Sequence, residues 1–491
     1  FHVHSKYSRA TSKECVPEFL DLWARRKGLA LIGTGDFTHA AWRAELREKL
    51  IPTDDGLYVL KKEHRMDSET AGAQEPVRFM VTGEISSIYK KDGKVRKVHN
   101  LILLPDLDKA DALSRRLETI GNLRSDGRPI LGLDSKALLQ ITLETCPNAV
   151  FIPAHIWTPH FSLFGTYSGF DDIEECFEEL TPHIHALETG LSSDPPMNWR
   201  LSALDRFTLV SNSDAHSPGN LAREANLFET ELSYAHIANA LANKQSGAFR
   251  GTLEFFPEEG KYHFDGHRNC GVCQPPTQTL AAKGVCPVCG GRITVGVLHR
   301  VEALADRADG FVPPEAPRYE SLIPLPEVIA ASTGLSAASA KGKALYARLL
   351  RELGPELDIL RKAPVEEIAR AAGPAMAEGI RRLREGKVDV SPGYDGEYGK
   401  VRILDPDEIA EASGQIRLFL GEPARKAAPA PKKAPAKEAA APLPPAAQEN
   451  EVPSMRAEEG DGLNPEQRAA RSDERRVGKE CSVTCRSRWS P

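Results

Sequence analysis

The chain has 491 residues, and its 63 basic and 69 acidic side chains give a net charge of −6. At about 150 residues per domain, this length predicts about three domains and excludes a single small module. No apolar run approaches the length of about 18 residues that a membrane-spanning helix needs, so we expect no membrane partner. The nine cysteines are clustered and do not resemble a disulfide framework, which suits a reducing compartment, so we expect a cytoplasmic protein. The mild acidity argues against nucleic-acid binding over the whole surface, but it does not exclude a local basic groove.

The first 255 residues alternate short apolar runs with helical patterns, which predicts βα units. The chain starts at Phe1 inside a strand-like run without an initiator Met, so we expect an incomplete N-terminus. Several runs end in polar clusters, at 33–36, 153–155, 188–190 and 211–216. Because the C-terminal ends of parallel strands converge in a barrel, these clusters predict an α/β barrel with its chemistry at the strand ends.

One antiparallel element interrupts this pattern. Residues 80–89 and 95–104 are strand-like and flank Asp92-Gly93, a strong two-residue hairpin signal. In that register, paired residue numbers sum to 185, which places His99 opposite Ser86 and Glu84 one diagonal step away on the same face. The spacing therefore predicts a carboxylate and an imidazole within reach of a shared ion.

The tip of this hairpin is basic. It carries Lys90, Lys91, Lys94, Arg96 and Lys97. We weigh two interpretations equally, a solvated charged turn and a tip that grips nucleic-acid phosphates.

The remainder of the chain divides by composition. Residues 256–300 form a cysteine-bearing module, and residues 301–420 are mainly helical in pattern. Residues 421–461 are rich in Ala, Pro and Lys, which predicts a flexible linker. Within residues 462–491, the basic segment from 471 onward resembles a cloning or assembly scar and is left out of the fold prediction.

Histidines and carboxylates recur at the predicted strand ends. Strand alternation places His2 and His4 on one face, where both can bind the same ion. The candidate metal ligands are His2, His4, Asp36, His39, Glu84, His99, His155, Asp214 and His216. Glu84, Asp214 and His216 are the candidate catalytic residues, with Glu84 favoured to bridge two ions. Mixed imidazole and carboxylate donors suit Zn²⁺, Mn²⁺ or Fe²⁺, and Mg²⁺ is a further candidate. A cluster of two or three such ions predicts phosphoester hydrolysis by an activated water.

A second metal-binding pattern lies in the cysteine-bearing module. The pattern is Cys270-x2-Cys273-x12-Cys286-x2-Cys289. Four thiolates at this spacing predict one closed structural Zn²⁺ site that contributes folding energy.

The ordered motifs resemble the polymerase and histidinol phosphatase (PHP) superfamily. They are His2-Val-His4-Ser5, Gly35-Asp36, Gly83-Glu84, Val98-His99, Ala154-His155 and Ser213-Asp214-Ala215-His216. The resemblance implies a PHP-type distorted (β/α)7 barrel with a trinuclear metal site, here joined to the four-cysteine zinc module and a mainly helical C-terminal domain. The superfamily's second motif usually reads Asp-His, whereas here it is Asp36-Phe-Thr-His39, so either Asp36 or His39 is the ligand.

Further motifs, taken together, resemble those of the endonuclease Q family, and this resemblance covers about residues 1–405. These motifs are Tyr7-Ser-Arg-Ala-Thr11, Pro153-Ala-His-Ile-Trp-Thr-Pro159, Glu188-Thr-Gly-Leu-Ser-Ser-Asp194, Gly251-Thr-Leu-Glu-Phe-Phe-Pro257, Gly296-Val-Leu-His-Arg300 and Pro392-Gly-Tyr-Asp-Gly-Glu397, with the four cysteines. The resemblance implies a DNA repair endonuclease that cuts damaged DNA on the 5′ side of uracil, hypoxanthine, xanthine and abasic sites, leaving a 3′-hydroxyl and a 5′-phosphate.

Recognition of a deaminated base requires a pocket for the extruded base. Trp157, Phe161, Phe164 and Phe170 follow His155 and either stack on such a base or pack the barrel rim. Ser193, Asn198 and Arg200 follow another strand end and are candidates for contacts with base edges or phosphate.

Two short motifs lie downstream. Gln415-Ile-Arg-Leu418-Phe419 resembles the pentapeptide that binds the bacterial sliding clamp. Gly462-Leu-Asn-Pro-Glu-Gln-Arg468 resembles the opening segment of superfamily 1 DNA helicases, which implies a helicase domain in a longer chain.

The same motifs are compatible with two other functions. A small-molecule phosphatase acting on a histidinol-phosphate-like ester would use the same metal ligands, but it leaves the zinc module and the basic hairpin tip without a purpose. A DNA-binding or clamp-binding scaffold with a degenerate barrel is the non-enzymatic alternative, and the nearly complete ligand set argues against it.

Overall fold

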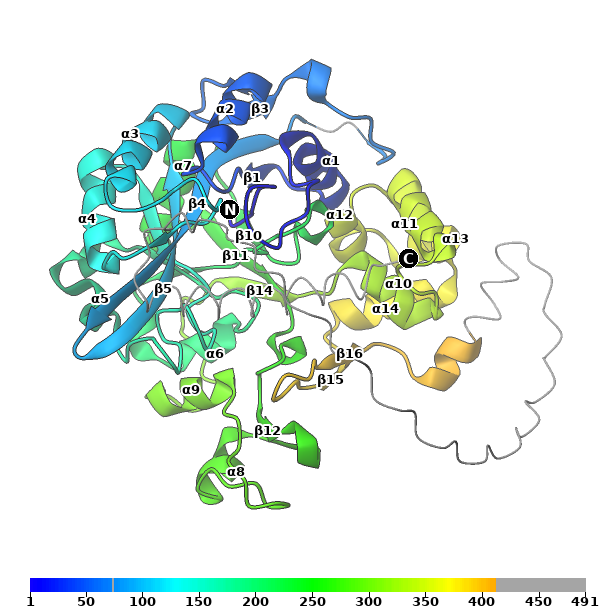
Figure 1. The fold of residues 1–491 in the computed structure, drawn as a ribbon. Helices are drawn as coiled ribbons and strands as arrows, with labels where there is room; N and C mark the ends of the chain where they lie inside the picture. The colour runs from blue at the N-terminus through cyan, green and yellow to red at the C-terminus, as the bar shows by residue number, and fades with distance from the viewer. Residues whose placement is uncertain (73–74, 412–491) are drawn as a thin grey trace, which may run out of the picture.

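A computed structural model of the chain describes residues 1–72 and 75–411. Figure 1 shows three parts: a large α/β region, a small arm near α8 and β12, and a group of helices around α10 to α14. The clamp-like pentapeptide, with Gln415, Leu418 and Phe419, lies outside the described residues, as do the linker and the segment 462–491. None of the helices described here has the length and apolar composition to cross a membrane.

The strands of the α/β region belong to several sheets. One sheet contains β1 (Leu31–Gly33), β2 (Leu50–Pro52), β3 (Tyr58–Leu60), β4 (Arg78–Lys91), β5 (Lys94–Leu104), β6 (Ile130–Leu131) and β7 (Val150–Pro153). A second sheet pairs β8 (Ala186–Glu188) with β9 (Thr208–Val210) in parallel. A third contains β10 (Ala225–Phe228), β11 (Phe249–Glu254) and β14 (Arg318–Ser321). The predicted mixed α/β fold is therefore present.

The parallel pairs bring strand ends together around one centre. β1 runs parallel to β4, β8 lies beside β7, and Val3 forms a parallel bridge with Ala215. Within the described residues these strands fall into separate sheets and not into one continuous ladder. The closed seven-stranded barrel therefore stays a prediction, while the convergence of strand ends on which the site depends is observed.

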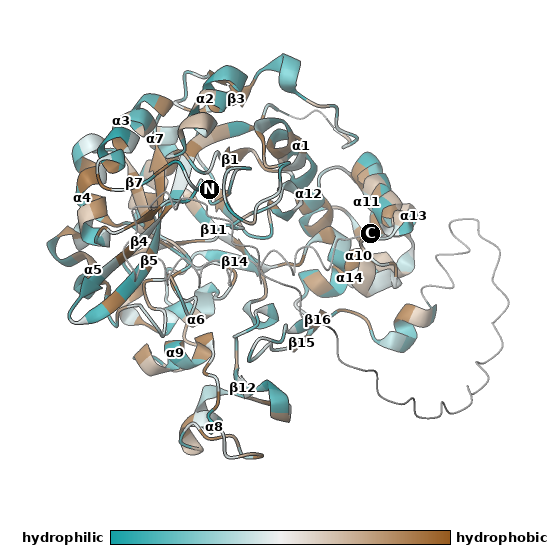
Figure 2. Ribbon diagram, viewed as in Figure 1, coloured by the Kyte–Doolittle hydropathy of each residue, from teal (hydrophilic) through white to brown (hydrophobic). Residues whose placement is uncertain are grey.

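Helices cover the outside of these strands. They are α1 (Pro17–Lys27), α2 (Ala40–Lys49), α3 (Leu107–Glu118), α4 (Ser135–Thr145), α5 (Ile173–Phe177), α6 (Pro195–Trp199) and α7 (Tyr234–Ala242). Asp106 caps α3 by accepting a hydrogen bond from Lys109 N, which satisfies one of the unpaired amides at a helix start. Trp42, Phe79 and Phe151 belong to the core beneath them, and hydrophilic residues mark the outer surfaces of α2 and α3 in Figure 2.

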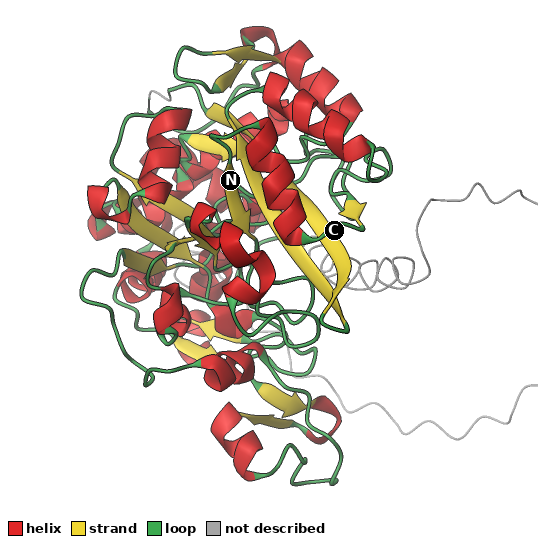
Figure 3. Cartoon of the chain, turned by 90° about the vertical axis from the view of Figure 1, so that its left-hand side faces the viewer, coloured by secondary structure: helices red, strands yellow, loops and turns green. Residues whose placement is uncertain are grey.

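The predicted hairpin is confirmed in its register. β4 and β5 pair from Val81 with Leu104 to Lys91 with Lys94, so the paired numbers sum to 185 and His99 lies opposite Ser86. Asp92 and Gly93 form the turn with φ of 52° and 74°, the positive values that this turn requires. Figure 3 shows the two strands as a long ribbon.

The arm and the C-terminal part contain shorter elements. They are β12 (Asp265–His267), β13 (Val272–Gln274), α8 (Pro276–Ala281), α9 (Val297–Leu304), α10 (Leu325–Thr333), α11 (Ala340–Leu353), α12 (Glu356–Arg361), α13 (Val365–Ala372), α14 (Pro374–Arg384), β15 (Asp389–Ser391) and β16 (Lys400–Arg402). The helices enclose their own apolar core, which includes Ile329, Leu349 and Ile380. A buried ion pair of 2.8 Å between Lys27 and Glu356 joins α12 to α1.

The sequence predicted that a separate helical domain begins near residue 301, and the structure differs from this prediction in one respect. β14 lies beyond it, yet β14 extends the sheet of β10 and β11 by parallel pairing of Thr252 with Tyr319. The C-terminal part therefore contributes a strand to the α/β region. Composition alone could not reveal this, because the strand has only four residues.

Candidate functional site

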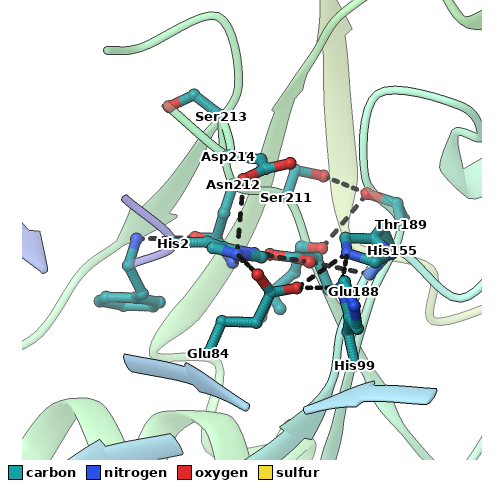
Figure 4. Close-up of polar contacts among 12 residues, drawn as sticks. His2, Glu84, His99, His155, Glu188, Thr189, Ser211, Asn212, Ser213 and Asp214 are labelled. Atoms are coloured by element: carbon teal, nitrogen blue, oxygen red, sulfur yellow. Dashed lines mark hydrogen bonds and ion pairs between the residues drawn. The ribbon is translucent and has the colours of Figure 1, made fainter. Parts of the chain in front are cut away.

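Glu84 lies at the centre of the candidate site, buried on β4 and surrounded by imidazoles (Figure 4). Its Oε1 atom is 2.6 Å from Nδ1 of His99 and 3.0 Å from Nε2 of His155. Its Oε2 atom is 3.4 Å from Nε2 of both His2 and His4. Because its two oxygens face different pairs of imidazoles, this carboxylate can bridge two ions.

Two groups of side chains can each hold a metal ion. The first is His2, His4, Glu84 and Asp214, and the second is Glu84, His99 and His155; the ligand atoms of each group lie within 4.8 Å of one another. Nε2 of His2 is buried without a hydrogen-bond partner. A buried imidazole nitrogen with no partner carries a desolvation cost that a metal ion would offset. The residues present therefore fit a two-ion centre.

Glu188 orients the first imidazole. Both of its oxygens lie 3.1 Å from Nδ1 of His2, so Nε2 of that ring points towards Glu84 and Asp214. Glu188 also accepts hydrogen bonds of 2.8 Å from the backbone amide of His155 and from Nδ2 of Asn212. A carboxylate behind a ligating imidazole fixes its orientation and raises its basicity. In the sequence, Glu188 stands at a predicted strand end and begins a motif shared with endonuclease Q, but nothing there indicates a contact with His2.

Asp36 orients the imidazole of His4 in the same way that Glu188 orients the imidazole of His2. Its Oδ1 lies 3.1 Å from Nδ1 of His4, and its Oδ2 accepts hydrogen bonds from Ser5 Oγ at 2.6 Å and Ser8 Oγ at 2.8 Å. Burial opposes its charge, but the His4 imidazole and the hydrogen bonds from Ser5 lower the pKa of Asp36. Asp36 therefore positions His4 and does not belong to either metal-binding group.

His39 also lies outside both groups. It precedes α2 as the N-cap residue, and its ring stacks on that of Tyr7 with 4.3 Å between centroids. The sequence left open whether Asp36 or His39 is a ligand, and neither of them lies in the two groups. The reason is that Ser5 and Ser8 surround Asp36, while the helix start directs His39 towards Tyr7.

Asp214 and His216 form the more open side of the centre. Their side chains are 29% and 21% exposed, whereas those of His2, His4 and Glu84 are fully buried. Nδ1 of His216 lies 2.9 Å from the carbonyl oxygen of Asp214, and its ring centroid is 4.4 Å from that of His4. His216 therefore adjoins the first group without being one of its four members, on the side that solvent reaches.

The centre has a strong negative potential. Burial raises the pKa of the Glu84 carboxyl, but His99 and Arg128 hold that pKa well below its ordinary value. Burial also opposes a charged His2, yet the carboxylates of Glu188, Glu84 and Asp214 raise the pKa of His2 to about 10. Such a potential favours divalent cations.

Arg128 was not predicted from the sequence. Its Nη1 lies 3.1 Å from Oε2 of Glu84, and its side chain is 17% exposed. It follows Gly127 in the segment before β6, with no motif to mark it. A guanidinium beside the carboxylate cluster provides a fixed positive charge with geometry suited to phosphate oxygens.

Backbone strain is concentrated at this centre. Asp36, His155 and Asp214 have φ values of 50°, 31° and 44°, in the left-handed region that non-glycine residues rarely adopt. At Gly190, a Cβ atom would lie 2.5 Å from Cβ of His155, so only glycine permits this approach. Strained backbone of this kind clusters at functional sites.

The aromatic side chains after His155 are buried. Trp157 donates a hydrogen bond of 2.8 Å from Nε1 to Oδ1 of Asn198, and its ring lies 5.0 Å from that of Phe164. Phe161 is 4% exposed and its ring lies 5.0 Å from that of His99. Of the two interpretations, rim packing fits this structure. These aromatic rings, with Phe170, do not present a free face for base stacking.

The polar residues near α6 that were candidates for contacts with DNA form hydrogen bonds and ion pairs within the protein. Ser193 Oγ donates a hydrogen bond of 2.9 Å to the carbonyl of Thr189, and Asn198 Nδ2 lies 3.2 Å from Ser193 Oγ. Arg200 is buried and forms an ion pair of 2.5 Å with Glu302 of α9. In this conformation they join α6 to its surroundings and do not face a substrate.

Some of the basic side chains at the hairpin tip pack against the protein, and others are exposed to solvent. Arg96 is buried over the ring of Phe170, with 4.0 Å to the centroid, and Lys91 pairs with Glu178 at 2.6 Å. Lys97 lies over the ring of Phe161. Lys90 and Lys94 are exposed and remain the candidates for phosphate contacts.

An exposed aromatic residue lies in the same loop that buries Phe161 and Phe164. Tyr167 is 59% exposed, and its ring stacks on that of His160 with 4.6 Å between centroids. The backbone amide of Tyr167 donates to the carbonyl of Pro159, which ties this residue to the segment after His155. The sequence contained no periodic signal that separates Tyr167 from its buried neighbours.

The arm brings together three of the four predicted zinc ligands. Cys270, Cys286 and Cys289 lie with His267 in one group whose ligand atoms are within 4.8 Å of one another. The fourth predicted ligand, Cys273, is exposed, and its thiol lies 3.9 Å from the carbonyl of Pro392. The structure thus differs from the sequence prediction at this one position.

Comparisons with known sequences identify relatives for most of the chain. Residues 324–387 match the family described as the MJ0043 C-terminal domain. The chain is 32% identical over 311 residues to the uncharacterised protein YqxK of Bacillus subtilis, covering 62% of this chain and 74% of YqxK. It is 34% identical over 256 residues to the uncharacterised protein MJ0043 of Methanocaldococcus jannaschii, covering 50% of this chain and 31% of that protein.

Comparisons with solved structures agree over a larger part of the chain. The lesion-specific endonuclease PfuEndoQ from Pyrococcus furiosus is similar with a TM-score of 0.72 and 30% identity, covering 84% of this chain and 98% of PfuEndoQ. Endonuclease Q in complex with a 27-mer duplex substrate, with an abasic lesion at the active site, has a TM-score of 0.71 and 31% identity, covering 83% of this chain and 96% of that one. At this identity and coverage, the chain belongs to the endonuclease Q family.

Proposed function

We propose that this chain is a metal-dependent DNA repair endonuclease. It hydrolyses the phosphodiester on the 5′ side of deaminated bases (uracil, hypoxanthine and xanthine) and of abasic sites. The observation that carries the proposal is Glu84, whose two oxygens face two separate pairs of imidazoles in a chain of the endonuclease Q family. Membership of a family that includes a lesion-specific endonuclease supports the substrate class.

Two divalent ions, Zn²⁺, Mn²⁺ or Mg²⁺, would be held by His2, His4 and Asp214 on one side, by His99 and His155 on the other, and by Glu84 between them. When bound, such ions supply an activated water and neutralise charge on the phosphate. Asp36 and Glu188 hold the imidazoles of His4 and His2 in position for this binding. The superfamily resemblance implied three ions, and the described ligand groups support two.

The chain's own residues then act on the substrate from the open side. Asp214 and His216 are the partly exposed members of the centre, so the scissile phosphate approaches over them. Arg128 contributes a guanidinium that can bind a non-bridging phosphate oxygen as negative charge increases in the transition state. The strained backbone at His155 and Asp214 persists only where the surrounding structure fixes it, which holds these ligands in one arrangement.

Damaged DNA is the proposed partner. The complex of endonuclease Q with a duplex that carries an abasic lesion supports this choice. Exposed Tyr167, stacked on His160 beside the segment that follows His155, is our candidate for contact with unstacked bases. Lys90 and Lys94 at the hairpin tip are candidates for backbone phosphate contacts, and binding through them would weaken as the salt concentration rises.

The experiment that tests this proposal compares substrate classes. The metal-loaded protein is incubated with a duplex that contains one deoxyuridine, with the undamaged duplex, and with a small phosphomonoester. The expected result is a nick in the first substrate only, immediately 5′ of the lesion. Hydrolysis of the phosphomonoester without nicking of the duplex would overturn the proposal in favour of a small-molecule phosphatase. The sliding-clamp and helicase predictions rest on residues after 411 and stay predictions.

A further inference from the structure

We propose that Asn226, on β10, is a positioning residue for the metal centre. Its side chain holds the segment that carries the ligand Asp214 and, through Asn212, the carboxylate that orients the ligand His2. Asn226 is not a member of either ligand group, so it acts on the centre through other residues. The inference rests on the two-ion centre proposed above and adds a residue that none of the sequence motifs contains.

The segment that carries Asp214 leaves its strand before it reaches that ligand. β9 ends at Val210, and pairing resumes only at the bridge between Ala215 and Val3. Between these points, residues 211–214 have no strand partner in the described part of the chain. Asp214 itself has a φ of 44°, a conformation that the chain keeps only under restraint from its surroundings. The segment therefore needs support from another element.

Asn226 takes the place of a strand partner for Ser211. Its Oδ1 accepts a hydrogen bond of 3.0 Å from the backbone amide of Ser211, and its Nδ2 donates one of 2.9 Å to the carbonyl oxygen of the same residue. Ser211 is fully buried, so its main-chain groups would lose hydrogen bonds without this partner. The two bonds fix the backbone where the segment leaves β9.

The same amide reaches the ligand His2 through two further residues. Nδ2 of Asn226 also donates a hydrogen bond of 3.1 Å to Oδ1 of Asn212. With its oxygen directed to Asn226, Asn212 turns its own Nδ2 to Oε1 of Glu188, at 2.8 Å. Glu188 in turn holds Nδ1 of His2. One side chain on β10 therefore supports both His2 and Asp214, which belong to the same ligand group.

A carboxamide is the side chain that these contacts require. The oxygen of the Asn226 amide faces an N–H donor, whereas its nitrogen faces two oxygen acceptors. An ionised aspartate would offer no donor to those two oxygens, and an aliphatic side chain would form none of the three bonds. The residue type at this position therefore follows from the contacts that it makes with the ligand segment.

The neighbouring strand β11 reinforces this support. Asn226 pairs with Thr252 of β11, so Glu254, two residues further along that strand, lies on the same face of the sheet. Glu254 accepts a hydrogen bond of 2.5 Å from Oγ of Ser211. The ligand segment is thus fastened to two paired strands, and a site supported by strands is held more precisely than one supported by loops.

Metal titration in the absence of DNA tests the inference, so the result does not depend on the nuclease reaction. Mn²⁺ is titrated into the metal-free parent and into Asn226→Ala. Calorimetry gives the affinities, and electron paramagnetic resonance separates a spin-coupled ion pair from a single ion. We expect the ion of the first ligand group to bind about 10-fold or more weakly in the variant, while the ion of the second group keeps its parental affinity. Asn243→Ala, the same change at an exposed residue after α7, is the matched control.

Two results would overturn the inference. A merely structural role would lower Tm and weaken both ions equally, and parental affinity for the first ion would exclude any role in positioning. Asn212→Ala gives a second measurement if Asn226→Ala does not fold, because it removes the donor to Glu188 and leaves both bonds between Asn226 and Ser211 in place. It should weaken the first ion alone, and equal affinities for parent and variant would contradict the inference. A parent that binds metal as expected but does not nick damaged DNA would overturn the proposed function and not the role of Asn226.

Discussion

The carboxylate of Glu188 lies 3.1 Å from Nδ1 of His2, and this contact directs the other ring nitrogen, Nε2, towards Glu84 and Asp214. Both residues are fully buried at the ends of separate segments, one at the chain start and one at the end of β8. The pair therefore fixes the orientation of a metal ligand before any ion binds.

Replacement of Glu188 by Gln should weaken metal binding without removing a ligand. The amide keeps the size of the side chain but loses the charge that orients the His2 ring, so we expect affinity for Mn²⁺ or Zn²⁺ to fall by about 10- to 100-fold. Isothermal titration of the metal-free protein measures this. Glu179→Gln, at an exposed side chain that pairs with Lys136, is the matched control. Equal affinities for both variants would argue against the orienting role.

Replacement of Arg128 by Ala should slow the chemical step more than it weakens substrate binding. Loss of one donor that stabilises transition-state charge costs about 100-fold or more in kcat. The measurement is single-turnover nicking at saturating duplex, with metal content determined in parallel. Arg128→Lys should recover only part of the rate, because an ammonium lacks the bidentate geometry. A full rate in Arg128→Ala would exclude a role for this guanidinium in the reaction.

Stability should fall with rising pH because of Glu254. Burial raises the pKa of this carboxyl from 4.5 to about 8 in the folded protein, and acidic Asp194 adds to the effect, although Ser211, 2.5 Å away, opposes it. Between about pH 4.5 and 8 the folded state binds more protons than the unfolded state, so stability is fully present below this window and decreases through it. Buried Glu224, whose pKa is also raised well above its ordinary value, acts in the same direction.

Glu254→Gln should therefore reduce the slope of Tm against pH between 5 and 8, because the amide stays neutral, and the contribution of Glu224 should remain. Thermal unfolding followed by circular dichroism checks this. Glu229→Gln, at an exposed side chain that pairs with Arg250, should retain the slope of the parent. A slope in Glu254→Gln equal to that of the parent would show that the pH dependence comes from other groups.

Tyr167→Ala should weaken binding of the lesion duplex while leaving the metal centre intact. Base stacking on an aromatic side chain contributes about 1–3 kcal/mol, so we expect Kd to rise by about 5- to 150-fold. Fluorescence anisotropy with a labelled abasic duplex measures this, and Ile51→Ala, at another exposed hydrophobic residue on β2, is the control. Identical Kd values for the two variants would remove Tyr167 from the interface.

Much of the candidate site was predictable because it depends on local patterns. The Asp92-Gly93 turn determined the hairpin register, and the register placed Glu84 near His99. The H-x-H pattern placed His2 beside His4. These relationships involve short segments whose geometry follows from turn type and strand alternation.

The remaining features depend on tertiary packing. Glu188 is separated from His2 by 186 positions and Arg128 from Glu84 by 44, and no local pattern signals either contact. The aromatic residues after His155 could not be divided into buried Trp157 and exposed Tyr167, because a loop has no periodicity. Cys273 lies outside the group of His267, Cys270, Cys286 and Cys289, because strand pairing in the arm places it on the opposite face of the ribbon from His267, and motif spacing does not encode that pairing.

The most direct test of the central claim is nicking of a duplex with one abasic site by the metal-loaded protein and by Asp214→Asn. Asp214 joins His2, His4 and Glu84 in one metal-binding group, and the amide removes its charge. We predict that the parent cuts once, 5′ of the lesion, leaving a 3′-hydroxyl and a 5′-phosphate, and that the folded Asp214→Asn variant does not cut. Nicking by Asp214→Asn at the parental rate would contradict the account. Equal nicking of the lesion duplex and of an undamaged duplex by the parent would also contradict it.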